Sequence, residues 1–137
     1  MYFDAVLDRF VKKSPVTVMT RVCLERALSP DALNELFEKH KEWQYTKKLL
    51  FSSMVDLMAL VVCRVQPSVS AAYRAMKDDL SVTLAAVYDK LDGIESDVSA
   101  AFVQHTAARL GPVVKELGAE LPPLLNGYRA RIIDGHH

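Results

Sequence analysis

The chain has 137 residues, of which 50% are hydrophobic and 25% are charged. A chain of this length is expected to form one domain and to bury roughly 65–70% of its unfolded surface. Its 17 basic residues balance its 17 acidic residues, which excludes the strong overall positive field of many nucleic-acid-binding proteins.

The first quarter of the chain has the periodicity of amphipathic helices. A first helix is expected before Ser14-Pro15, and a second over residues 18–28. A third is expected to begin at Ser29-Pro30, because serine can cap a helix and proline fits the first helical position. The first helix has apolar residues at spacings of three and four, namely Phe3, Val6, Leu7, Phe10 and Val11.

The most apolar stretch of the chain, "LLFSSMVDLMALVVC", covers residues 49–63. Its 15 residues fall short of the roughly 20 that cross a membrane, and Asp56 at its centre would be costly in lipid. We therefore expect a buried central helix over residues 47–64 of a cytoplasmic protein, with a membrane-associated protein as the weaker alternative. Cys23 and Cys63 are expected to be buried, reduced thiols.

Two short helices and one long helix are expected next. Ser68 can cap the first of them, and Ser81 the second, which should end near Gly93 because glycine is preferred just past a helix end. The long helix is expected over residues 94–110, closed by Gly111-Pro112.

Residues 67–91 carry a possible DNA-reading element. Two short helices with a tight polar turn resemble a helix-turn-helix, which would place Ser81 and Thr83 at the start of the recognition helix, where they can meet phosphate. The turn has no glycine, and the surrounding residues are mostly acidic, the opposite of what phosphate contacts need. An ordinary helical hairpin in the core is at least as compatible with this pattern.

A second candidate DNA contact lies in the polar connector before the central helix. Lys47 and Lys48 follow Trp43 and Tyr45 in the sequence. An aromatic ring between basic residues can stack on a nucleotide base. The alternative is a solvated basic face whose aromatic rings are tucked into the core.

The character of the sequence changes after residue 117. Residues 118–127 contain two glycines and two adjacent prolines, which is typical of a linker. Residues 128–137 then alternate in strand fashion and end in Asp134-Gly135. Asp134 fits either an Asp-Gly hairpin turn or a carboxylate that a strand holds rigidly at a metal site. The expected fold is mainly α, with a helical domain over residues 1–117, a linker and a single strand.

Taken together, these segments resemble the N-terminal part of DDE transposases of bacterial insertion sequences, of the insertion-sequence-four type. The resemblance covers essentially the whole chain, in segments that begin at residue 19 and end in "RIIDGHH", residues 131–137. From Ile132 to His137 this stretch fits a family pattern close to R-x-[IVL]-[IVL]-D-G-x-H, but Arg131 lies one position closer to the aspartate than the arginine of that pattern. In that family, a helical region precedes an RNase H-like catalytic domain, whose first strand carries the first catalytic aspartate.

The resemblance implies a role for Asp134 as the first of three carboxylates that hold two divalent metal ions, such as Mg²⁺, in the complete parent enzyme. It also implies that the chain stops just after this residue, so that it binds no metal cofactor and catalyses no DNA cleavage by itself. The implied partners are the DNA of the element ends and a second protomer or a full-length transposase, with no membrane. A stand-alone helical module that inhibits the full-length transposase is the alternative.

Overall fold

The computed structural model describes residues 15–44 and 48–128, with side chains from residue 18 onward. Within these ranges the chain is mainly helical, as predicted, and contains no strand. The helices are α2 (Pro15–Ala27), α3 (Pro30–His40), α4 (Phe51–Val62), α5 (Val69–Ala75), α6 (Leu84–Asp92) and α7 (Ser96–Glu116).

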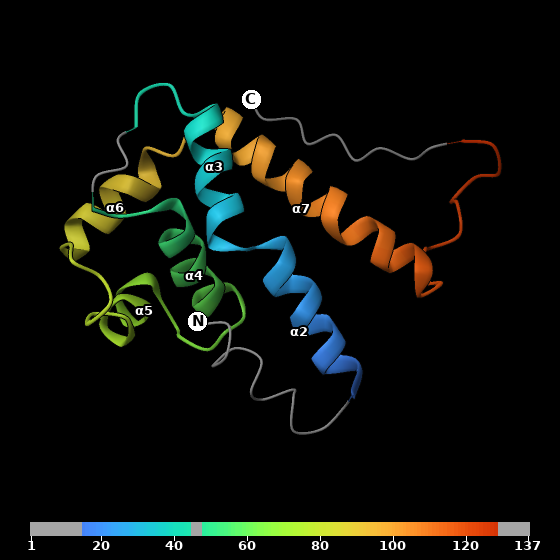
Figure 1. Ribbon diagram of the computed structural model, residues 1–137, viewed down its shortest axis with the longest axis horizontal. Coiled ribbons are helices and arrows are strands. Elements are labelled where there is room, and N and C mark those ends of the chain that lie inside the picture. The colour runs from blue at the N-terminus through green and yellow to red at the C-terminus, as the bar shows by residue number, and fades with distance from the viewer. Residues whose placement is uncertain (1–14, 45–47, 129–137) are drawn as a thin grey trace.

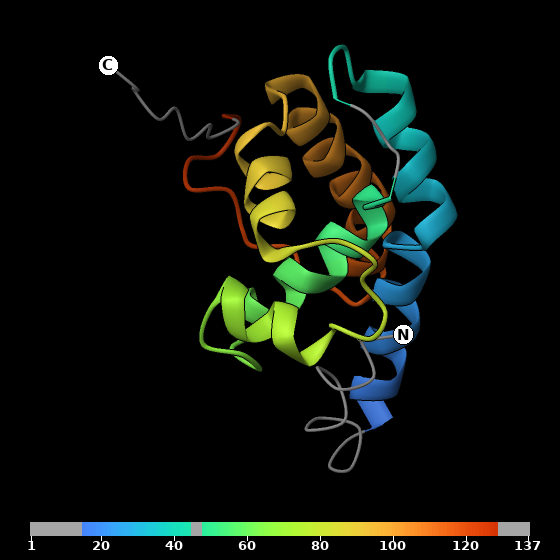
Figure 2. The same cartoon turned by 90° about the vertical axis from the view of Figure 1, so that its left-hand side faces the viewer.

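Helix α4 lies at the centre of the molecule. The short helices α5 and α6 lie on one side of it, and α2, α3 and α7 lie on the other (Figures 1 and 2). Helix α7 packs against both α3 and α2. As Figure 1 shows, α2 and the second half of α7 extend together away from the other helices.

Two apolar clusters hold these helices together. The first joins α4, α5 and α6, and Leu57 and Val87 are fully buried in it. The second joins α3, α4 and α7 around the ring of Phe37, which stacks on Phe51 at 5.2 Å between ring centroids. The Phe102 ring meets Phe51 edge-on at 5.8 Å. Because α4 contributes to both clusters, it is the buried central helix that the apolar stretch predicted.

The central helix is shorter than expected, since it begins at Phe51 rather than near residue 47. Leu50 has an extended backbone, and the side chain of Asn34 on α3 accepts a hydrogen bond from the Ser52 N–H at 3.0 Å. The start of α4 is thus fixed by a residue from another helix. Local sequence carries no sign of such a long-range cap.

The helix caps agree only in part with the sequence. Ser68 caps α5 as predicted, with its hydroxyl accepting from the Ala71 N–H. Ser29 occupies the N-cap position of α3, but its side chain makes no capping hydrogen bond. The expected cap at Ser81 is wrong, because Thr83 caps α6 by accepting from the Ala86 N–H. Gly93 ends α6 as predicted.

The expected end of the long helix at Gly111-Pro112 is also wrong. Helix α7 continues through Pro112 to Glu116, although proline removes one helical hydrogen bond. Leu110, Val113 and Leu117 line a seam with Met19 and Leu24 of α2. Helices α2 and α7 are in contact, and tertiary contact of this kind can override the local preference for a helix end.

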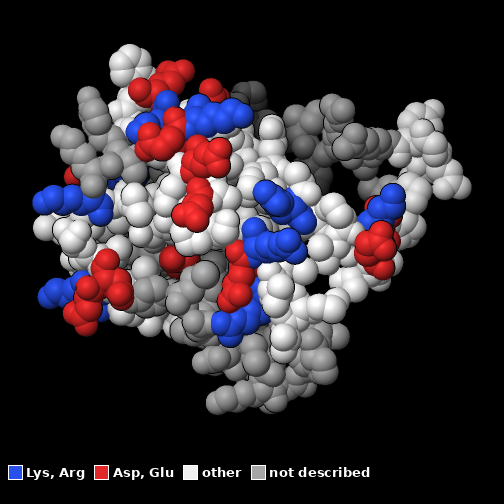
Figure 3. Space-filling model, viewed as in Figure 1, with Lys and Arg blue, Asp and Glu red and all other residues white. Residues whose placement is uncertain are grey.

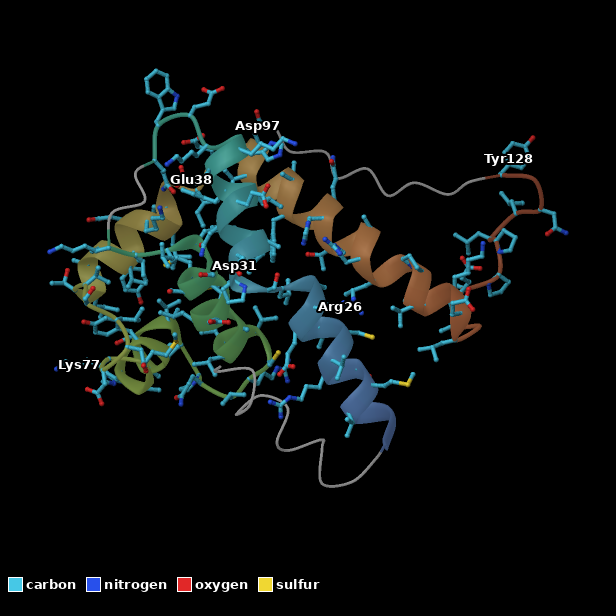
Figure 4. The ribbon with its side chains drawn as sticks, viewed as in Figure 1. Arg26, Asp31, Glu38, Lys77, Asp97 and Tyr128 are labelled. Carbon is cyan, nitrogen blue, oxygen red and sulfur yellow. The ribbon has the colours of Figure 1, made fainter. Side chains whose placement is uncertain are left out.

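Helix α7 ends in a Schellman motif. Gly118 has a φ of 61°, its N–H donates to the Lys115 carbonyl, and the Ala119 N–H donates to the Val114 carbonyl. The chain beyond it runs away from the helices toward Tyr128 (Figure 4). The predicted strand over residues 128–137 lies outside the described residues apart from Tyr128.

The two cysteines are free, but they are less buried than predicted. Cys23 is partly exposed on α2, and Cys63 is exposed because it follows the last turn of α4. The sequence placed Cys63 at the end of an apolar run, which does not reveal whether other helices cover that end. Within residues 15–44 and 48–128, none of the helices is both long and apolar enough to cross a membrane.

Candidate nucleic-acid interface

The residues predicted to contact DNA or metal fall in different parts of the chain. Asp134 and Lys47 lie outside the described residues. Lys48 is exposed in the segment that leads into α4, and Ser81 is exposed in the segment that leads into α6. Their neighbours Leu49 and Leu80 are buried in the cluster that joins α4, α5 and α6.

The connection between α5 and α6 is longer than that of a helix-turn-helix. It spans residues 76–83, whereas a helix-turn-helix has a turn of about three to four residues. Leu80 is buried within it, and the Tyr73 hydroxyl donates to the Val82 carbonyl at 2.8 Å. The connection is therefore tied into the core, and the hydroxyl of Thr83 is already used for capping.

Charge on this side of the molecule is mostly negative. Of the charged residues on α5, α6 and their connection, Asp78, Asp79, Asp89 and Asp92 are exposed, against Arg74 and Lys77. Lys90 is partly buried, and its ammonium group lies 4.2 Å from the centroid of the Phe37 ring. Burial is the main cause that lowers the pKa of Lys90, followed by the charge of Lys41.

A second and more basic surface lies where α2, α3 and α7 meet. Arg26 of α2 and Arg109 of α7 line one depression of about 220 Å³. Arg109 also lines the next depression, of about 320 Å³, together with Lys39, His40 and His105. Figure 3 shows basic side chains beside one another in this region. We call these five residues the basic surface; Glu35 is the acidic residue in the lining of its depressions.

Packing between α2 and α7 creates the basic surface. The two helices run antiparallel, and a ring nitrogen of His105 (Nε2) lies 2.9 Å from the Ala27 carbonyl oxygen at the end of α2. This contact places Arg109, one turn further along α7, beside Arg26. Arg26, Lys39 and Arg109 are exposed, so their charged groups can reach phosphate oxygens.

Trp43 lies on a loop that a single carboxylate holds in place. The backbone N–H groups of Glu42, Trp43 and Gln44 all donate to the carboxylate of Glu95, at 2.6, 2.8 and 3.1 Å. The Gln44 side chain donates to the Lys90 carbonyl at 3.0 Å. Trp43 itself is 81% exposed, so its ring is available for stacking rather than tucked into the core.

The carboxylate of Glu95 is stabilised in its charged form. Hydrogen bonds from the backbone of Trp43 and Glu42 are the largest causes that lower its pKa. The same residue occupies the N-cap position of α7. Glu95 thus links the loop that carries Trp43 to the start of the helix that carries Arg109.

Sequence reasoning did not find the basic surface as a unit. Arg26, Lys39 and Arg109 lie far apart in the chain, and each stands on the exposed side of a different helix. The available signal was an arginine or lysine at the polar face of three neighbouring helices, which does not by itself show that the faces meet.

The described residues hold no group of three or more histidine, cysteine, aspartate or glutamate side chains suited to a metal ion. Comparison with known proteins gives no further guide, since no family model, curated protein or solved structure matches the chain.

Proposed function

We propose that this chain is the N-terminal region of a cytoplasmic DDE transposase of the insertion-sequence-four type, and that it binds the DNA of the element ends. The observation that carries this proposal is "RIIDGHH" at residues 131–137, in which residues 132–137 match the pattern of the family's first catalytic segment. A mainly helical region precedes it, the order that the family requires. Residues 128–137 would then begin an RNase H-like domain.

DNA contact is proposed for the basic surface rather than for the connection between α5 and α6. Arg26, Lys39 and Arg109 are exposed around adjoining depressions, while the side with Ser81 and Thr83 is lined mostly by acids. Contacts with phosphate release counterions, at a slope of roughly −0.9 in log affinity against log salt for each phosphate neutralised. Three such contacts predict a slope of about −2 to −3.

Fluorescence anisotropy with a labelled duplex from the ends of the element tests this proposal. The double variant Arg26→Glu with Arg109→Glu should weaken binding. It should also make the slope of log affinity against log salt less steep by about 2, because two phosphate contacts are lost. The matched control is Arg74→Glu with Lys77→Glu, the same charge change on the opposite side of the molecule, where Figure 4 shows Lys77 far from Arg26. The control should bind like the unaltered chain.

The same assay distinguishes the two candidate faces. If Lys48→Glu and Ser81→Ala weaken binding and the arginine variants do not, the DNA lies on the α5–α6 side and the basic surface is not the interface. If the unaltered chain shows no salt-dependent binding to any duplex, DNA binding itself is excluded.

We propose no strand cleavage for this chain alone. Asp134 supplies the first carboxylate of the implied triad, and a single carboxylate does not hold the two metal ions that activate a nucleophile and stabilise the leaving oxygen. Incubation with a supercoiled plasmid bearing the element ends, with Mg²⁺ or Mn²⁺, should leave the plasmid intact. This part of the proposal would be overturned by metal-dependent nicking that co-purifies with the protein and is absent from the Asp134→Asn variant.

A helical interaction module that inhibits a full-length transposase is the second candidate function. The segment after α7 favours it, because four large apolar side chains are exposed within eight residues there and could contact another protein: Leu121 at 90%, Leu124 at 85%, Leu125 at 68% and Tyr128 at 75%. Sedimentation of the chain with a full-length transposase tests this role. The two proteins should co-sediment without DNA if inhibition works by protein pairing. The double variant Leu121→Ser with Leu124→Ser should then abolish their co-sedimentation.

A further inference from the structure

An apolar groove runs along α4 on the side that faces α2 and α7. It has a volume of about 430 Å³, and its lining includes Leu24 of α2, Met54 and Met58 of α4, and Phe102 of α7. Val62 and Val103 lie in the same lining and are 74% and 65% exposed. Contiguous apolar surface of this kind commonly marks a place where another segment docks.

We propose that residues 1–14 of the same chain occupy this groove as an amphipathic helix. These residues lie outside the described part of the chain, and they precede α2 directly. Their sequence presents one apolar stripe at helical spacing, made by Phe3, Val6, Leu7, Phe10 and Val11. Such a stripe needs a matching apolar surface, because a helix of this length is marginal by itself in water.

The length and attachment of the segment fit the groove. Proline disfavours helical backbone at the residue before it, so a helix over residues 1–13 is expected to end before Pro15, where α2 begins. A helix over residues 1–13 is about 20 Å long, and Leu24 lies about 14 Å along α2 from Pro15. A helix that folds back beside α2 therefore reaches Leu24 and the α4 side of the groove. A second copy of the chain has no comparable tether, so the segment of the same chain has the higher effective concentration.

Hydrogen exchange of the full chain, read by mass spectrometry on the peptide covering residues 1–13, tests the proposal. Docking predicts slow exchange in this peptide. Phe10→Asp should speed it by about tenfold or more, and so should Val62→Asp, which changes only the groove. Val62 is exposed among the described residues, so Val62→Asp buries a charge only if something covers it.

Two matched controls carry the same chemical change away from the contact. Ala5→Asp lies on the polar face of the expected helix, and Ala85→Asp lies on the exposed face of α6. Both should leave exchange of residues 1–13 unchanged. Unaltered exchange elsewhere in the chain shows that each variant is folded.

Three results would overturn the proposal. Rapid exchange of residues 1–13 in the unaltered chain would mean that the segment is not docked. Protection that survives Val62→Asp would place the segment on another surface. Protection that falls on dilution, together with a dimer in sedimentation, would show that a second copy covers the groove. None of these measurements involves DNA, so their outcome is independent of whether the proposed function is correct.

Discussion

The molecule has two regions with different packing. The body, made by α3 to α6 and the first half of α7, buries large side chains completely, as at Phe37, Leu57 and Val98. In the arm, made by α2 and residues 104–116 of α7, the described apolar side chains are largely accessible, for example Val18 at 47% and Val22 at 54%. The body is therefore stabilised by its own core, whereas the arm relies on the contact between α2 and α7 and on the C-terminal end of α2, where Leu24 packs against the body.

The largest expected difference between the regions comes from emptying the body's core. Phe37 has no exposed surface and stacks on Phe51. Phe37→Ala should lower the free energy of unfolding by about 3–5 kcal/mol, because it removes apolar contacts and leaves a cavity. Urea unfolding followed by circular dichroism measures this change.

Val22→Ala is a smaller truncation in the arm, and it should cost less than about 0.5 kcal/mol because the side chain is half exposed. Equal costs for the two variants would contradict the division into body and arm. A large cost at Val22 would instead show that another surface covers the arm in solution.

The second expected effect concerns Pro112 in the arm. Replacement by alanine restores an N–H at this position, and proline inside a helix costs up to about 3 kcal/mol relative to alanine. Pro112→Ala should therefore slow hydrogen exchange in the last turns of α7. The gain in global stability should be smaller, because the arm can open while the body stays folded.

Pro112→Gly separates the effect of the restored N–H from the effect of helix preference. Glycine also restores the N–H, but it favours helix less than alanine. It should slow exchange less than Pro112→Ala. If neither variant changes hydrogen exchange near residues 108–116, Pro112 does not lower the stability of the last turns of α7.

The third effect depends on pH and concerns the loop that carries Trp43. The folded protein lowers the pKa of Glu95 through backbone hydrogen bonds. A lowered acid pKa adds stability above the unfolded pKa, near 4.5, and this contribution is lost as the pH falls through the folded pKa. Stability should therefore decline as the pH falls below about 5, and Glu95→Gln should weaken that decline while being less stable at pH 7.

Trp43 is the only tryptophan of the chain, so its fluorescence anisotropy reports on the loop directly. Glu95→Gln should lower this anisotropy at pH 7, whereas Glu42→Gln, the same change within the loop, should not. An unchanged anisotropy in Glu95→Gln would mean that the three backbone hydrogen bonds do not restrain the loop.

Local signals in the sequence predicted the parts of the fold that local chemistry decides. The start of α3 at Pro30, the cap of α5 at Ser68 and the end of α6 at Gly93 follow from residues within one turn. The start of α4 and the end of α7 were wrong, because Asn34 and the seam with α2 act across the chain. Tertiary contacts of this kind leave no local pattern.

The candidate site was less predictable than the fold. Trp43 was singled out from the sequence, but its exposure depends on Glu95, about 50 residues further along the chain. Arg26, Lys39 and Arg109 become neighbours only because α7 packs against both α2 and α3. A surface assembled from three helices needs their packing angles and register, which periodicity alone does not provide.

The smallest expected effect lies at the end of α4, in the body. Arg64 has a φ of 57°, in the left-handed region, and its N–H donates to the Val61 carbonyl while the Val65 N–H donates to the Leu60 carbonyl. This is a Schellman motif with arginine where glycine is favoured. The left-handed conformation costs an L-residue about 1–2 kcal/mol, and the greater freedom of glycine in the unfolded chain offsets about 0.4–1 kcal/mol of any gain.

Arg64→Gly should therefore raise the free energy of unfolding by about 1 kcal/mol or less, as urea unfolding would show. Arg64→Ala keeps the strained backbone and should give no gain. A gain of the same size in Arg64→Ala would mean that the arginine side chain, rather than the backbone conformation, weakens this end of the body.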